Sequence, residues 1–142
     1  MLLDVALALA VVLMVAAVIW PTLPRANNAA RLSATAMEVA TVLRGDRSRA
    51  SRDGRPAVSL VDLDRRTVTS AGGRTVKIGA GFDVSVLTTG DCRQSDRRFR
   101  IEFRPDGSSC GAVVRLAAGG RAFRVRVNWL TGWVDVVGPE KV

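Results

Sequence analysis

The chain has 142 residues, with 21 basic against 13 acidic side chains and a formal net charge of +8 at pH 7. This length suits one compact domain plus a simple additional segment. The sequence contains no histidine and no tyrosine, which excludes Ser-His-Asp catalysis, Cys-His catalysis and histidine-based zinc sites. No glycine-rich phosphate loop stands between a predicted strand and a helix. We therefore expect no enzyme activity, no cofactor and no metal.

The positive charge belongs to the part of the chain that follows an apolar N-terminal run. Without Asp4, that part holds 21 basic against 12 acidic residues, a net charge of +9. All of these basic residues except Lys77 and Lys141 are arginines, and they are scattered along the sequence. A solvated arginine-rich surface explains the pattern. A site for anionic lipid, nucleic acid or an acidic protein is the alternative.

The first element is the apolar run from Leu2 to Trp20, which only Asp4 interrupts. As a helix it would be roughly 28 Å long, close to the hydrocarbon thickness of a bilayer. No basic residue precedes the run and no small-x-small cleavage site follows it, so a retained anchor is favoured over a signal peptide. Trp20 suits the membrane interface, and Pro21 and Pro24 suit the end of the helix. We expect the anchor over residues 1–24.

Two signals about the orientation of this anchor disagree. The positive-inside rule, applied to Arg25, Arg31 and the later arginines, places the large domain in the cytoplasm. The two cysteines, Cys92 and Cys110, fit an oxidising compartment instead.

Asp4 is the residue that a plain anchor would not contain, because a carboxylate deep in a bilayer costs about 2.5 to 3.5 kcal/mol. Either Asp4 reaches the lipid headgroups from its position near the helix end, or a compensating group comes from elsewhere.

The order of residues around this carboxylate resembles the start of type IV pilins and pseudopilins. Met1-Leu2-Leu3-Asp4-Val5, the apolar run and Pro21 follow that family's order of apolar stretch, acid, long apolar helix and proline. The resemblance implies that Asp4 and Pro21 act in filament assembly, with Asp4 pairing with an N-terminal amine in the apolar filament core. The acid is Asp where the family usually has Glu. A Gly-Phe-type prepilin peptidase site, which would precede a methylated N-terminus, is not present before Met1, and we expect a longer gene product or a trimmed start.

A second, amphipathic helix is predicted over residues 25–53. One apolar stripe with spacings of four, three and four residues defines the side that we expect to lie on a sheet. The stripe consists of Leu32, Ala36, Val39 and Leu43. Gly45 weakens the helix by about 1 kcal/mol relative to Ala. The helix is expected to end at Asp53-Gly54-Arg55-Pro56, which offers a left-handed terminator followed by proline.

After Pro56 the pattern alternates between apolar and polar residues, which predicts a β domain over residues 54–142. Turn residues separate short candidate strands, and Gly79-Ala80-Gly81 and Arg104-Pro105-Asp106-Gly107-Ser108 are predicted to join neighbouring ones. Before the C-terminal hairpin we expect strands at 57–62, 66–69, 74–78, 82–87, 99–103 and 112–116.

The clearest strand pair is a hairpin between 123–129 and 133–137, with Thr131-Gly132 as a two-residue turn. Its register predicts that alternate residues share one core-facing side. These are Val125, Val127, Trp129, Val134 and Val136. Arg124, Arg126 and Asp135 fall on the other side, so the two arginines are candidate contacts for a polyanion or a partner protein.

Cys92 and Cys110 lie eighteen residues apart and flank the strand at 99–103. A disulfide between them would stabilise the folded state by roughly 3 kcal/mol, because closing the loop lowers the conformational entropy of the unfolded chain. Two free thiols are the alternative.

Two pairs of acids, Asp62 with Asp64 and Asp91 with Asp96, raise the question of a calcium site. Neither pair resembles a loop that supplies six or more oxygen ligands. We interpret them as turn and surface acids.

One long helix followed by an all-β remainder resembles the branch shared by general secretion pathway protein H and FimT. The matching stretches are 43–60, Phe103-Arg104-Pro105-Asp106-Gly107-Ser108 and Asn128-Trp129-Leu130-Thr131-Gly132-Trp133-Val134. The resemblance implies an α+β, type IV pilin-like fold in which the long N-terminal helix packs on an antiparallel β domain of about two sheets.

The same resemblance implies a function as a minor pseudopilin of the type II secretion system. The protein would sit in the bacterial inner membrane with its domain in the periplasm, and would assemble with other pseudopilins near the tip of a filament that supports export of folded proteins. An exoprotein or the secretin would be a further partner. The alternative is a FimT-like minor pilin that binds DNA during uptake. Such proteins are expected to carry Gly-Arg-x-Arg near the C-terminus, whereas this region reads Gly132-Trp133-Val134-Asp135, so secretion is favoured.

Overall fold

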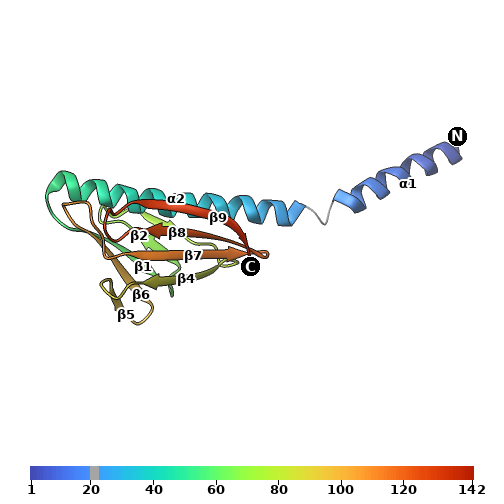
Figure 1. Cartoon of the computed structure of the whole chain (residues 1–142). Coiled ribbons are helices and arrows are strands. Elements are labelled where there is room, and N and C mark those ends of the chain that lie inside the picture. Colours follow the sequence, from blue (N-terminus) through green and yellow to red (C-terminus); the bar gives the residue numbers. More distant parts are fainter. Residues whose placement is uncertain (20–22) are drawn as a thin grey trace.

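The computed structural model describes the backbone of residues 1–19 and 23–142 and the side chains of residues 1–18 and 28–142. Within these ranges, helices α1 (Leu2–Ile19) and α2 (Leu23–Asp53) precede nine strands. Figure 1 shows α1 beyond the N-terminal end of α2, away from the strands. Trp20 and Pro21, which the sequence places at the end of the anchor, lie outside the described residues. Pro24 does not end a helix but lies in the first turn of α2, where a proline is tolerated.

Helix α1 takes in most of the predicted anchor, and all of its described side chains, from Leu2 to Val18, are exposed. In the part of the chain that the structure describes, no helix is long and apolar enough to cross a membrane. The anchor over residues 1–24 stays a prediction, as does the division of the remainder at residues 25–53 and 54–142.

Helix α2 buries the predicted apolar stripe. Its four members, Leu32, Ala36, Val39 and Leu43, are fully inaccessible to solvent, because their spacing places them on one side of the helix. Helix α2 contacts β1 (Ala57–Asp62), β7 (Ala112–Ala118), β8 (Arg121–Val127) and β9 (Val134–Lys141). It ends at Asp53, and Gly54 follows with φ 63°, the left-handed terminator that the sequence predicts.

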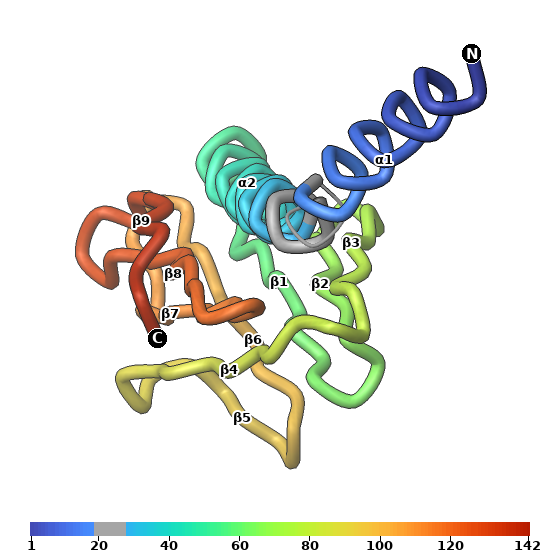
Figure 2. Tube along the Cα trace, turned by 90° about the vertical axis from the view of Figure 1, so that its right-hand side faces the viewer, coloured from blue at the N-terminus to red at the C-terminus, as the bar shows by residue number. Residues whose placement is uncertain are grey.

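The strands form two antiparallel sheets, as predicted. The five-stranded sheet has the order β3-β2-β1-β6-β5 and the four-stranded sheet has the order β4-β7-β8-β9. The remaining strands are β2 (Thr67–Thr69), β3 (Thr75–Lys77), β4 (Asp83–Thr88), β5 (Arg93–Ser95) and β6 (Arg98–Phe103). Figure 2 looks along α2 and shows the two sheets on either side of it. The core therefore lies where the helix meets both sheets.

One strand was not predicted, and two predicted turns do not close hairpins. Strand β5 pairs with β6, but its three residues are polar and exposed, so no alternation marks it. The segments 79–81 and 104–111 carry the chain from one sheet to the other instead of joining neighbouring strands. Only one bridge, between Phe103 and Ser109, closes the turn at 104–108.

The C-terminal hairpin has a longer loop than the two-residue turn predicted. Val127 pairs with Val134, and Val125 pairs with Val136, which leaves residues 128–133 between the strands. This register differs from the predicted one by two residues, so each side chain keeps its side of the ribbon. Val125, Val127 and Val134 are buried as predicted. The placement of Trp129 in the core was wrong, because Trp129 lies in the loop and is 59% exposed.

Asp46 is a buried carboxylate that joins α2 to the five-stranded sheet. Its Oδ2 accepts a hydrogen bond from the Ser59 hydroxyl at 2.5 Å and another from the Ala71 N–H at 3.0 Å. These bonds fix the rotation of α2 relative to β1, since a buried carboxylate requires its donors.

Candidate assembly and partner-binding surfaces

Asp4 projects from the first turn of α1 into solvent. Its Oδ2 lies 3.6 Å from the amine of Met1, and both groups are fully exposed. The carboxylate is therefore within reach of an N-terminal amine in the single chain. An attraction between such exposed charges is weak in water and grows when the pair is enclosed in an apolar environment.

The predicted polyanion contacts, Arg124 and Arg126, lie on the solvent side of β8 and are paired with acids. Arg124 forms an ion pair with Glu140. Arg126 Nη2 lies 2.5 Å from Asp135 Oδ2, and these two residues are cross-strand neighbours. The hydrogen bond to Asp135 raises the pKa of Arg126. Both arginines are thus partly neutralised within the chain, which lowers their value as contacts for a polyanion.

The loop Asn128–Trp133, here called the aromatic loop, carries three exposed apolar side chains that sequence reasoning did not single out as a surface. Trp129, Leu130 and Trp133 are 59%, 64% and 66% exposed. Trp133 lies between two surface hollows, one bordered by Arg44 and the other by Arg126. The signal available in the sequence was Asn128, which favours a loop closed by its own side chain over a continuing strand.

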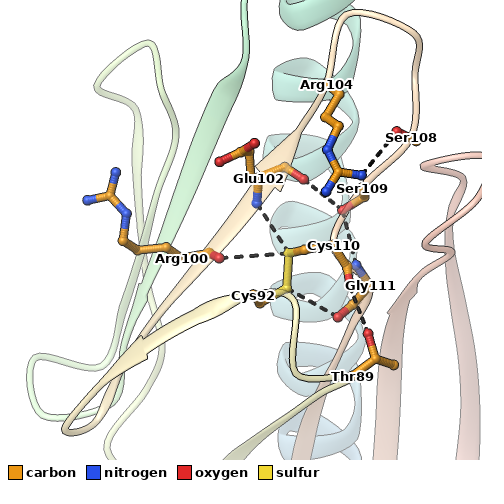
Figure 3. Close-up of a disulfide and its surroundings, with 9 residues drawn as sticks. All are labelled: Thr89, Cys92, Arg100, Glu102, Arg104, Ser108, Ser109, Cys110 and Gly111. Carbon is orange, nitrogen blue, oxygen red and sulfur yellow. Dashed lines mark hydrogen bonds between the residues drawn. A yellow bond between two sulfur atoms is a disulfide. The ribbon is translucent and has the colours of Figure 1, made fainter.

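Cys92 and Cys110 form a disulfide, with 5.0 Å between their Cα atoms, which confirms the predicted bridge. Figure 3 shows the bond between the segment before β5 and the segment before β7. The Thr89 hydroxyl donates to the Cys110 carbonyl at 2.7 Å, and the Glu102 N–H lies 3.4 Å from the Cys110 sulfur. The disulfide therefore joins two of the three connections that pass between the sheets, the one from β4 to β5 and the one from β6 to β7.

The comparisons with known proteins agree with this architecture. No protein-family model matches the chain. Over 133 residues the chain is 26% identical to type II secretion system protein H of Xanthomonas campestris pv. campestris. The alignment covers 94% of this chain and 79% of that protein. The crystal structure of the type IV minor pilin FimU of Pseudomonas aeruginosa matches with a TM-score of 0.57 at 14% identity, covering 80% of this chain and 93% of that one. A second crystal form of FimU gives 0.55 at 15% identity.

The chain has a type IV pilin-like fold. The resemblance inferred from its motifs is confirmed by the likeness to protein H over nearly the whole chain. The predicted α+β architecture is confirmed by the helix packed on two antiparallel sheets and by the match to FimU. Neither comparison names an enzyme. Together they support a structural role as a minor pseudopilin or pilin, in company with other pilin-like subunits.

Within the pilin-like fold, Asp62, the last residue of β1, and Asp64 serve as turn acids. Asp62 is almost completely buried, and its Oδ1 accepts the N–H groups of Asp64 and Arg65 at 3.0 and 2.9 Å. Its Oδ2 accepts from Arg98 Nε at 3.1 Å. Asp64 pairs with Arg97 at 2.8 Å. The bond from the Arg65 N–H is the main reason that the pKa of Asp62 is lowered.

Proposed function

We propose that this protein is a structural minor pseudopilin of the type II secretion system, assembled near the tip of a pilin-like filament that supports export of folded proteins. The observation that carries this proposal is the exposed apolar helix α1, with an acid at position 4, attached to a domain that is packed on a separate helix. The similarity to type II secretion system protein H over 94% of the chain supports the choice of system.

Helix α1 requires an apolar environment that the single chain does not supply. Its described side chains include Leu2, Leu3, Leu7 and Leu13, each more than 60% exposed. An apolar surface of this kind marks an interaction site for protein or membrane. Packing α1 among the corresponding helices of other subunits would bury it at roughly 25 cal/mol for each Å² removed from water.

We place the protein in the inner membrane, with the domain on the periplasmic side. The apolar run from Leu2 to Trp20 supports the membrane attachment. The Cys92–Cys110 disulfide supports an oxidising compartment for the domain, against the positive-inside signal. Exoprotein or secretin contacts belong to the same proposal, as later steps in the action of the filament.

DNA uptake is the less supported alternative. The two arginines that the sequence suggested for it are paired with Glu140 and Asp135. The likeness to the minor pilin FimU, at 14% identity, shows the fold alone.

The assembly role rests on Asp4, and its replacement tests the proposal. Asp4→Ala should reach the inner membrane at normal levels, because the carboxylate lies near the helix end, where it is hydrated before assembly. The same variant should enter the filament poorly and lower secretion, because an N-terminal amine in the apolar core then lacks its partner. Membrane fractionation, filament isolation and the amount of exported protein measure these three effects.

Asp4→Glu and Asp4→Asn are the matched controls. Glu keeps the charge and should be nearly silent, whereas Asn keeps the shape and should behave like Ala. If Asp4→Ala is incorporated and supports secretion like the parent, Asp4 merely reaches the headgroups and its assembly role is wrong.

A further inference from the structure

The aromatic loop gathers a large share of the exposed apolar surface of the domain. Apart from Met1 and α1, the large hydrophobic side chains that are exposed among the described residues are Met37, Leu87, Trp129, Leu130, Trp133 and Val142. Half of these six lie within five consecutive residues. Two of the three are tryptophans, the residue type most enriched at the energetic centres of protein interfaces.

The loop holds these side chains in a fixed arrangement. Asn128 Oδ1 accepts the N–H groups of Leu130 and Thr131 at 2.9 and 3.0 Å, and the Asn128 carbonyl accepts the N–H of Gly132 at 2.9 Å. At Trp129 the carbonyl accepts from the Ser109 N–H at 2.9 Å. A segment ordered before binding loses little conformational freedom when a partner arrives.

Two arginines of α2 and a neighbouring turn complete this support. Arg44 donates to the Val134 carbonyl through Nε and Nη2 at 3.1 and 3.0 Å, and Arg47 Nε donates to the Thr131 carbonyl at 3.0 Å. Gly132, with φ 64°, lies so close to the Gly107 carbonyl that no Cβ fits there. The tryptophans are thus presented to solvent by a rigid base.

On one side of Trp133 the loop borders a positively charged hollow lined by Arg44 and Arg47, whereas on the other side Arg126 is paired with Asp135. Arg44 is exposed and Arg47 is half-buried. Among the described residues no carboxylate lies within 4.0 Å of either guanidinium. A partner with carboxylates beside an apolar pocket would match this surface, and a second copy of this chain, at a net charge of +8, would not.

The aromatic loop lies at the end of the domain that is remote from α1. Arg44, which donates to Val134 directly after the loop, is about 30 Å along α2 from Leu23. In Figure 1, β9 starts near the C-terminal end of α2 and runs back toward α1. In a filament with α1 at its centre, this end would be available to the domain of a neighbouring subunit. It also lies far from the membrane in which α1 would be anchored.

We propose that the aromatic loop, together with Arg44, is the contact with the domain of a different pilin-like subunit, one that offers an apolar pocket flanked by carboxylates. This inference rests on the proposed function, because it requires a neighbour in a filament. To the proposed function it adds the surface through which this chain contacts its neighbour and the chemistry of the neighbour's surface.

Site-specific crosslinking in cells tests this contact. A photoreactive benzoylphenylalanine in place of Trp133 in the full chain should crosslink to the domain of another pilin-like subunit, identified by mass spectrometry. The matched control is the same group in place of Leu87, which is 70% exposed on β4 and should give no such adduct. An adduct with the same chain, with lipid or with none of the filament subunits, in cells where the protein does enter the filament, overturns the inference.

Binding of the purified partner to the full chain in detergent supplies the second measurement. Trp133→Ala should raise the dissociation constant at least tenfold, as expected for a tryptophan anchor, with an unchanged melting temperature because the side chain is exposed. Arg44→Glu should weaken binding more than Arg52→Glu, since Arg52 is exposed in the last turn of α2 away from the loop contacts. Equal affinities for parent and Trp133→Ala contradict the proposal. A parent chain that never enters a filament overturns the proposed function, and the inference with it.

Discussion

Asp62 links the turn after β1 to the neighbouring strand β6 through a carboxylate that is almost completely buried. The backbone N–H groups of Asp64 and Arg65 and the guanidinium of Arg98 all donate to it. Because these donors favour the ionised form, the pKa of Asp62 is lowered in the folded chain. Its stabilising contribution is complete above the ordinary aspartate pKa of about 3.9 and is lost as the pH falls below that value.

We therefore expect Asp62→Asn to be less stable than the parent at neutral pH and to lose less stability on acidification from about pH 5 to about pH 3. Urea unfolding of the full chain in detergent, followed by circular dichroism across this range, measures the difference. The exposed Asp91 provides the control, and Asp91→Asn should follow the parent. Parallel pH profiles for the parent and Asp62→Asn would show that the contacts of Asp62 contribute nothing.

Among the elements, two of the three connections between the sheets are held together by a single covalent link. The chain leaves the four-stranded sheet after β4, enters β5 and β6 of the other sheet, and returns at β7. Cys92 and Cys110 lie in these two connections and both are buried. Their bond closes a loop across a sequence separation of 18, which lowers the conformational entropy of the unfolded chain.

We expect the double variant Cys92→Ala with Cys110→Ala to lower the free energy of unfolding by about 3 kcal/mol. Alanine is preferred to serine here because a buried hydroxyl without a partner adds a cost of its own. Urea unfolding measures the change, and the parent under reducing conditions should match the double variant. Thiol labelling of the denatured, unreduced parent should find no free cysteine. A double variant as stable as the parent would show that the disulfide does not stabilise the fold.

The net charge of +8 attracts anions to the molecule as a whole but does not favour their binding at one particular site. Its exposed arginines are spread over α2 and both sheets, and six of the strand and turn arginines pair with acids, namely Arg65, Arg97, Arg98, Arg115, Arg124 and Arg126. Binding to duplex DNA should therefore be weak and independent of sequence.

A salt titration of the full chain with duplex DNA measures this expectation. We predict a dissociation constant between about 1 and 100 μM at physiological salt, falling steeply as salt is removed. Replacing Arg124 and Arg126 by Gln should weaken binding no more than replacing Arg52 and Arg93, which are also exposed. Submicromolar affinity at physiological salt, lost on replacing Arg124 and Arg126, would favour DNA uptake over secretion.

Features that depend on local pattern were predictable from the sequence. The buried stripe of α2 follows from residue spacing alone, and Gly54 ends the helix because glycine adopts the left-handed conformation without strain. Asp4 stands out because an acid in an apolar run has few explanations. The disulfide was predictable as a pairing because the chain has two cysteines.

Tertiary structure decided which strands share a sheet and which side chains meet across the chain. The turns at 79–81 and 104–108 read as ordinary loops, yet both cross between sheets, since α2 offers a surface to each sheet. Trp129 continues the alternation of β8 in the sequence, but the Asn128 side chain closes a loop before the strand can continue. The position of that loop depends on Arg44, Arg47 and the Gly107 turn. Contacts between residues so far apart along the chain carry no periodic signal, so the exposure of the tryptophans could be decided only by the folded structure.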